Sequence, residues 1–168
     1  MVGMKYRIPN LPIFEKNARA MGATPVVVAW SEYPFALMQG VVDGGECSKD
    51  SYRSSGLYES AKYVADVDYA YPVEQICFST QFWNSLSEED QKVISDAAAQ
   101  VASHHSERTL DKWEEDKEWL INEGGVTFCD IDRQAFIDAT EPLGKELQDE
   151  GFFTTKDLYD PVSYTHLT

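Results

Sequence analysis

Arg7 is the residue of this sequence whose type and position say most about chemistry. It lies in the apolar run Tyr6–Ile8, near the carboxyl end of a predicted β-strand. In a parallel α/β sheet, ligands bind in the crevice at the carboxyl ends of the strands. The planar guanidinium group offers a fork of N–H donors that matches a carboxylate. Arg7 is therefore a candidate anion-binding residue; the alternative is a solvent-facing arginine on an edge strand.

Other reactive side chains form no catalytic or metal-binding pattern. Cys47 follows the Gly44-Gly45 turn, where α/β folds place functional groups, but a buried or idle thiol is the better explanation. His104 and His105 are adjacent, whereas metal binding from one helix face needs a spacing near i, i+4. No triad spacing, nucleophile elbow or phosphate loop occurs, and the three cysteines form no disulfide framework. We therefore expect no catalytic residue, metal or cofactor.

Composition excludes several classes of protein. The chain has 168 residues with 14 Lys+Arg against 29 Asp+Glu, a formal net charge of −15. Such a charge repels phosphate backbones, so nucleic-acid binding is not expected. No apolar run approaches the ~20 residues of a membrane-spanning helix, so direct membrane insertion is not expected either. Hydrophobic residues make up 43%, as in a globular domain.

The first part of the chain alternates short apolar runs with helical patterns. This alternation predicts βαβ units and a mainly parallel sheet. We expect strands at residues 5–8, 25–30 (buried) and 41–43, a turn at Gly44-Gly45, helices at residues 12–21, 31–39 and 50–61, and an extended segment at residues 63–80.

A long helical pattern follows the extended segment. Ser87 and Asp90 resemble a capping box, which predicts a helix start near Ser87. The pattern runs to about Glu123, where Gly124-Gly125 ends it. A helix of this length is unusual in a compact domain and indicates one that bridges two bodies or is kinked. The remaining expected elements are a strand at residues 126–129 and a helix at residues 132–147 with a kink at Pro142.

The C-terminal residues 162–168 differ from the rest of the sequence. They match the translation of a transposase adapter used in sequencing libraries, so they are excluded from arguments about fold and function. The alternative is an ordinary polar C-terminus. If the adapter interpretation holds, we expect the chain to be a fragment of a longer gene product.

Six short motifs, in a fixed order and spacing, make residues 3–150 similar to a known family. They are GMKYRIPN at residues 3–10, MGATP at 21–25, WSE at 30–32, ALMQGVVDG at 36–44, LYESAKY at 57–63 and FWNSLSEEDQK at 82–92. Together they resemble the solute-binding receptors of tripartite ATP-independent periplasmic (TRAP) transporters. Members of that family are not enzymes; they bind a solute between two α/β lobes and deliver it to membrane subunits.

The resemblance implies a fold and a location. The expected fold is α/β: the second lobe of a bilobed periplasmic-binding-protein-like fold plus a long bridging helix, with the first lobe largely missing. The implied division is a second-lobe core at residues 1–62, an inter-lobe crossing strand at 63–80, the bridging helix at 81–125 and a C-terminal strand and helix at 126–161. No signal peptide precedes Lys5, which taken literally indicates the cytoplasm. The resemblance instead implies a periplasmic protein whose signal peptide was lost by truncation.

The resemblance also assigns roles to single residues. Arg7 falls on the family's arginine that pairs with the substrate carboxylate, and Asn10 follows it in the same Arg-x-Pro-Asn motif. Trp30 falls on an aromatic position that lines the pocket. These three residues are expected to bind the ligand.

Three further ligand-binding residues are expected from the same comparison. Glu46 and Cys47 fall in a stretch where the family has Gly-Gln-Glu-Asn, so here a thiol replaces an amide that commonly binds ligand. Tyr69 lies where the chain recrosses between the lobes. The departure at Cys47 leaves the ligand class open.

Three hypotheses about function follow. The first is a fragment of a periplasmic receptor that captures a small organic acid and works with the membrane subunits of a TRAP transporter. The second is the same fold as the ligand-sensing domain of a signalling protein. The third is a small cytoplasmic α/β enzyme that uses Cys47 or the pair His104-His105.

Overall fold

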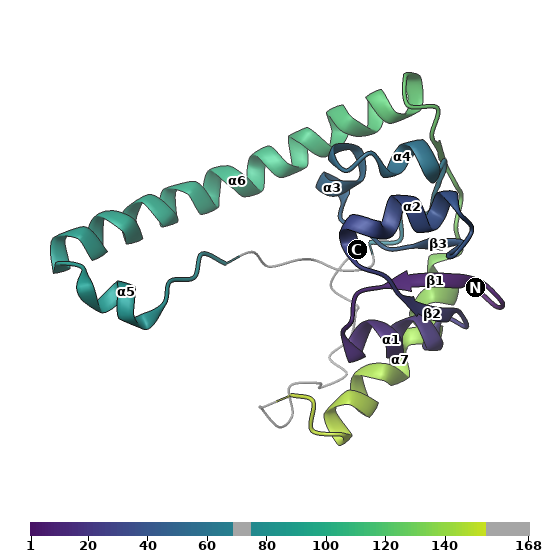
Figure 1. Ribbon diagram of the computed structural model, residues 1–168, viewed down its shortest axis with the longest axis horizontal. Coiled ribbons are helices and arrows are strands. Elements are labelled where there is room, and N and C mark those ends of the chain that lie inside the picture. The colour runs from purple at the N-terminus through teal and green to yellow at the C-terminus, as the bar shows by residue number, and fades with distance from the viewer. Residues whose placement is uncertain (69–74, 154–168) are drawn as a thin grey trace. The chain divides into compact units, whose positions relative to one another are not determined.

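The structure, a computed structural model, describes residues 1–68 and 75–153 of the chain (Figure 1). Tyr69 and the tail at residues 162–168 lie outside this part. The chain divides into two compact units. The first contains residues 1–47, 63–67 and 128 onward, and the second contains residues 48–62 and 68–127.

A parallel sheet forms the centre of the first unit. Its strands β1 (Lys5–Ile8), β2 (Thr24–Val27) and β3 (Gly44–Gly45) lie in the order β2-β1-β3, and both neighbours run parallel to β1. Because β1 is central, Tyr6, Arg7 and Ile8 are all buried. The α/β alternation predicted from the sequence is therefore confirmed.

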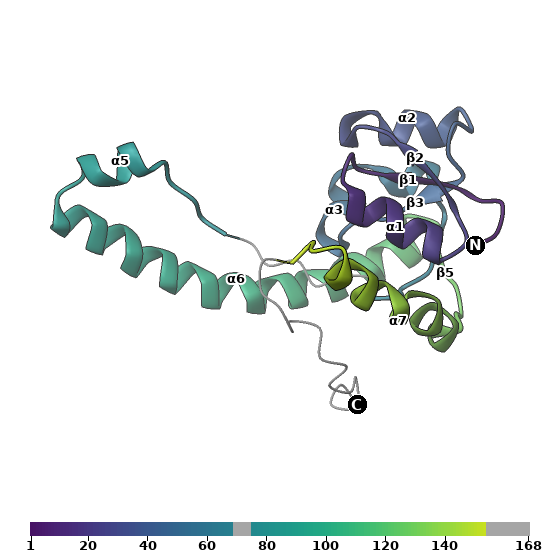
Figure 2. The ribbon, with the colours of Figure 1, turned by 90° about the horizontal axis from the view of Figure 1, so that it is seen from below.

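Two helices far apart in the sequence pack together in the first unit. The helix α1 (Pro12–Ala20) contacts β1 and β2, and α7 (Arg133–Asp149) lies beside α1 (Figure 2). Lys16 Nζ on α1 donates to Glu146 at 2.6 Å and to Glu150 at 2.8 Å. The C-terminal part of the chain thereby completes the unit that the N-terminal part begins. The helix α7 continues through Pro142.

The buried strand expected at residues 25–30 is wrong in extent and in burial. The observed β2 ends at Val27, which is 56% exposed, and Trp30 begins a short 3-10 helix, η1 (Trp30–Glu32). The physical reason is the strand order, which places β2 at an edge of the three-stranded sheet. The helix expected at residues 31–39 is correspondingly shorter, α2 (Tyr33–Met38).

The expected strand at residues 41–43 and turn at Gly44-Gly45 are also wrong. The backbone N–H groups of Val41 and Val42 instead bond to the Ala36 carbonyl at the end of α2, and Val42 is buried there as a core residue. The two glycines form β3 themselves, pairing with Tyr6 and Arg7. Val42 thus fills the core at the end of α2, Val41 stays exposed, and the two glycines supply the strand.

In the described residues of the second unit there are four helices. They are α3 (Lys49–Ser54), α4 (Leu57–Ser60), α5 (Thr80–Ser85) and α6 (Glu88–Asn122). The single helix expected at residues 50–61 is wrong, because Gly56 adopts a left-handed φ of 74° and separates α3 from α4. Two short strands, β4 (Tyr63–Val64) and β5 (Thr127–Phe128), pair with each other, and all of their residues except Thr127 belong to the first unit.

The long helix expected from Ser87 to Glu123 is confirmed as the single helix α6. The Ser87 hydroxyl accepts the Asp90 N–H at 3.1 Å, which is the predicted N-terminal cap. Trp113 and Leu120 on this helix are buried, but Val93, Val101 and Leu110 stay exposed, because the part of the chain that the structure describes does not cover them. No helix in the described residues is long and apolar enough to cross a membrane.

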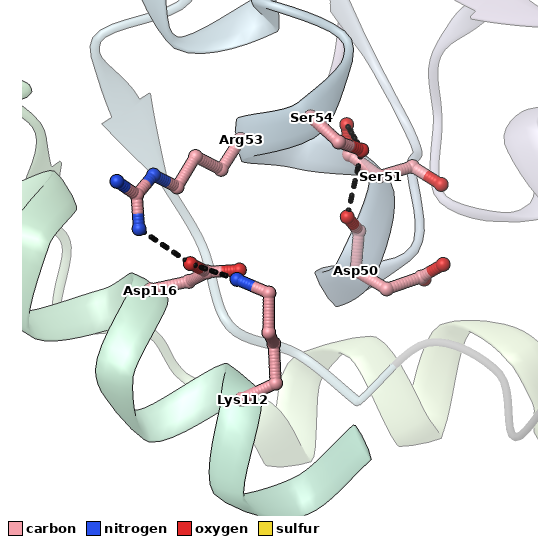
Figure 3. Close-up of polar contacts among 6 residues, drawn as sticks. All are labelled: Asp50, Ser51, Arg53, Ser54, Lys112 and Asp116. Carbon is pink, nitrogen blue, oxygen red and sulfur yellow. Dashed lines mark hydrogen bonds and ion pairs between the residues drawn. The ribbon is translucent and has the colours of Figure 1, made fainter. Parts of the chain in front are cut away.

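A buried carboxylate joins α3 to α6. Asp116 is 2% exposed and accepts hydrogen bonds from Arg53 at 2.7 Å and from Lys112 at 2.5 Å (Figure 3). The Arg53 guanidinium also lies 4.0 Å from the centroid of the Trp119 ring. Burial opposes ionisation, but the hydrogen bonds from Lys112 and Arg53 prevail and lower the pKa of Asp116. The ionised carboxylate therefore contributes to packing between these helices.

We expect Asp116→Asn to destabilise the second unit by roughly 1–3 kcal/mol at pH 7, because two charge-assisted hydrogen bonds to a buried group are weakened. A lowered pKa means that this contribution is present above the ordinary pKa of about 4 and is lost as the pH falls through the lowered value. Urea unfolding at pH 7 and at pH 3 measures both effects. The matched control is Asp96→Asn, since Asp96 pairs with Lys92 at the same i, i+4 spacing on α6 but is exposed. Equal losses in the two variants would contradict the prediction.

Candidate functional site

The candidate site lies where the three parallel strands end. Arg7 is on β1, the segment 28–30 follows β2, and the segment 46–47 follows β3. Parallel strands present their carboxyl ends at the same edge of a sheet, which is where open α/β sheets bind ligands. All of these residues belong to the first unit.

The guanidinium group of Arg7 is held from several sides. Its Nε donates to the Val28 carbonyl at 2.9 Å, and its Nη1 donates to Glu46 Oε1 at 3.2 Å. The Trp30 and Tyr33 ring centroids lie 5.4 and 5.2 Å from the guanidinium carbon, within range of cation–π attraction. Among the described residues nothing accepts from Nη2. Arg7 therefore has a fixed position and keeps donors for a further acceptor.

Glu46 is the acidic partner in this site. Its side chain is 20% exposed, against 5% for the side chain of Arg7. Burial raises the pKa of Glu46, and the charge of Arg7 lowers it by a smaller amount, so the pKa stays above its ordinary value. Oε2 of this carboxylate accepts no hydrogen bond from the described residues. A cation and a partly desolvated anion therefore lie side by side.

Gly45 allows β3 to pack closely against Arg7 and Tyr33. A Cβ atom at this position would lie 2.6 Å from the Tyr33 hydroxyl, 2.8 Å from Arg7 Cβ and 3.0 Å from the Arg7 carbonyl oxygen. Both neighbours are buried, so neither can move aside easily. A residue without a side chain is required where β3 passes β1 and α2.

The structure brings some of the predicted site residues together and not others. Arg7, Trp30 and Glu46 are joined by the contacts above, and Trp30 is 42% exposed. Cys47 is half-buried next to Glu46. Asn10 is exposed in the bend after β1 and forms no hydrogen bond to Arg7. Tyr69 lies outside the described residues.

Sequence reasoning missed Tyr33, Gly45 and the Val28 carbonyl. The spacing of Trp30 and Tyr33 was a usable signal, because residues three apart share one face of a helical turn. Their rings lie 6.0 Å apart in the structure. A main-chain carbonyl and the close approach of a glycine have no sequence signature, since each depends on which strand lies beside which.

A concave, largely apolar surface lies in the second unit. It has a volume of about 380 Å³, and Ile76, Phe78, Trp83 and Ile94 are among its lining residues. It contains no charged side chain that could fix a polar ligand. His104 and His105 are exposed on α6. No group of three or more His, Cys, Asp or Glu side chains in residues 1–68 and 75–153 could hold a metal ion.

The protein-family match and the similar proteins all point to one family. Residues 1–150 match the family described as bacterial extracellular solute-binding protein, family 7. A solute-binding protein of Roseobacter denitrificans is 34% identical over 134 residues, which are 80% of this chain and 41% of that protein. The sialic acid-binding periplasmic protein of Vibrio cholerae is 29% identical over 145 residues, which are 86% of this chain and 44% of that protein. The chain thus spans less than half the length of these relatives.

Solved structures agree with the sequence comparison. A TRAP periplasmic solute-binding protein of Chromohalobacter salexigens with bound D-glucuronate superimposes with a TM-score of 0.83 at 28% identity, covering 89% of this chain and 50% of that one. The ectoine-binding protein of Halomonas elongata gives a TM-score of 0.79 at 26% identity, covering 89% and 50%.

An α/β unit with a buried arginine at the carboxyl ends of its parallel strands, together with these matches, defines a protein of the solute-binding receptor class. The chain belongs to the bacterial extracellular solute-binding protein family 7, the receptors of TRAP transporters. Members of this family are receptors and not enzymes, so the hypothesis of a small cytoplasmic enzyme is wrong. The fold is mixed α/β and corresponds to part of the bilobed receptor.

We expect Gly45→Ala to destabilise the first unit by about 1–3 kcal/mol, because the new methyl group overpacks a site with no free volume. Thermal unfolding measures the loss. Gly44→Ala is the matched control, since a Cβ there meets only the terminal methyl of Met4, which can rotate away. The prediction fails if both alanine variants melt at the same temperature as the parent.

Proposed function

We propose that this chain is part of a periplasmic receptor that captures a small organic acid and delivers it to the membrane subunits of a TRAP transporter. The observation that carries the proposal is Arg7, a buried arginine with unused N–H donors at the ligand edge of a parallel sheet. Membership of the solute-binding family supports it.

The chemistry of the site favours an anion with an apolar or ring face. A guanidinium group binds a carboxylate through two parallel charge-assisted hydrogen bonds. A chain with a net charge of −15 needs such a local cation to hold an anion. Trp30, exposed beside Arg7, offers a ring surface against which the solute can pack. Asn10, Glu46, Cys47 and Tyr69 complete the proposed set of ligand-binding residues.

The names of the relatives support an acid as the ligand class. One relative is a sialic acid-binding protein, another a C4-dicarboxylate-binding protein, and a structural neighbour holds D-glucuronate. All three ligands are acids. We extend to this chain only the shared feature, a carboxylate for Arg7 to bind.

The proposal includes the place of this chain in the receptor. It spans about half of the relatives and neighbours, from 41% to 50% in the examples above. We propose that residues 1–62 form the second-lobe core, 63–80 the inter-lobe crossing, 81–125 the bridging helix and 126–161 the C-terminal strand and helix. Residues 162–168 are proposed to derive from a sequencing adapter. We also propose a periplasmic location, which the periplasmic binding proteins among the relatives support.

The test is a binding measurement on the natural polypeptide that contains this chain. A panel of organic acids is screened by thermal shift, and the strongest ligand is titrated by calorimetry. Arg7→Ala should weaken binding at least about a hundredfold, because losing one side of a buried charge pair costs ~3–5 kcal/mol. Arg7→Lys should also weaken it, since a point charge cannot copy the fork.

Two control variants accompany this experiment. Arg19→Ala removes an exposed arginine that pairs with Glu15 on α1 and should leave binding unchanged. Cys47→Ser should matter less than Arg7→Ala, because a thiol is a weak hydrogen-bonding group. If Arg7→Ala binds the acid as tightly as the parent, the assignment of the site is wrong; if no acid binds, the proposed function is wrong.

A further inference from the structure

The unused hydrogen-bonding capacity of the site lies on two neighbouring groups of opposite charge. Arg7 Nη2 has donors without an acceptor in the described part of the chain, and Glu46 Oε2 is an acceptor without a donor there. We propose that Glu46 is a specificity-determining residue, which selects acids carrying a hydroxyl or amine on the carbon next to the carboxylate. This inference rests on the proposed function, because it takes the ligand carboxylate to bind at Arg7.

The geometry places the ligand carboxylate next to Glu46. Glu46 Oε1 is 3.2 Å from Arg7 Nη1, so it already occupies one donor of the guanidinium group. The Nε donor is used by the Val28 carbonyl, 2.9 Å away. A second carboxylate must therefore bind the remaining donors of the same small planar group. Two anions then share one cation, and their mutual repulsion weakens the binding of a plain carboxylic acid.

A donor on the ligand's α-carbon converts this repulsion into an attraction. Such a hydroxyl or amine lies beside its own carboxylate, and therefore on the side where Glu46 is. It can donate a charge-assisted hydrogen bond to Oε2 while the ligand carboxylate binds Arg7. The 20% exposure of the Glu46 side chain leaves it open to such contact.

The burial of Glu46 makes this contact selective. A partly buried carboxylate has lost hydration, and burial accordingly raises its pKa. A bound acid without an α-donor covers Glu46 further and leaves its second oxygen without a partner, which is costly. Sites built to bond a substrate hydroxyl discriminate strongly against the analogue that lacks it. The competing explanation is that Glu46 only positions Arg7, in which case it affects all acids equally.

The experiment compares acids that differ only at the α-carbon. The natural polypeptide containing this chain is titrated calorimetrically with three pairs: D-gluconate and 2-deoxy-D-gluconate, mandelate and phenylacetate, and lactate and propionate. In the parent, the hydroxy acid of each binding pair should be favoured by about tenfold or more. Glu46→Gln keeps the side-chain shape but removes the charged acceptor, and should reduce that preference to less than about threefold. Glu15→Gln, an exposed carboxylate on α1, is the matched control and should keep the parent's preference.

The outcomes separate this inference from the proposed function. If acids bind and Arg7→Ala abolishes binding, but the members of each pair bind equally, the function stands and the role of Glu46 is overturned. If Glu46→Gln weakens both members by the same factor, Glu46 acts only by positioning Arg7 and the inference is overturned. If no member of any pair binds, both are overturned.

Discussion

The burial of one guanidinium group is the constraint on which the candidate site of this protein depends. A cation is stable inside a protein only where its hydrogen bonds and its charge are compensated. Arg7 receives that compensation from the Val28 carbonyl and the Glu46 carboxylate, with aromatic rings on its flanks. Each partner follows a different strand of the sheet from Arg7 itself. The site therefore exists only when the sheet has the order β2-β1-β3 and its parallel register.

The same constraint explains why the third strand contains only glycine. Arg7 and Tyr33 occupy the space in which a side chain at position 45 would lie. Close approach of β3 to β1 brings Glu46 within hydrogen-bonding distance of the guanidinium group. The apolar residues that favour strands are used just before this point, where Val42 fills the core. Residues of low strand propensity, Gly44 and Gly45, therefore form β3, because the backbone there must come close to the buried charge of Arg7.

The second unit also contains a buried ion, but of the opposite charge. Asp116 is a buried anion on α6, compensated by Arg53 of α3 and by Lys112 one turn earlier. Its partners stay partly exposed, so their charges remain hydrated while the carboxylate is enclosed. In both units a buried ion is thus bonded to groups from separate elements. Such an ion fixes how those elements pack, because any other arrangement leaves it unpaired.

The sequence by itself determined the elements whose causes are local. Alternating apolar and helical patterns identified the parallel α/β unit, Ser87 marked the start of α6, and Arg7 stood out as a charge within an apolar strand. Tertiary structure alone decided the features that depend on neighbours distant in the chain. Val27 is exposed because β2 is an edge strand, and Gly44-Gly45 is a strand because β1 lies beside it. The partners of Arg7 were likewise hidden: a backbone carbonyl has the same chemistry at every residue, so only the folded register shows which one accepts its hydrogen bond.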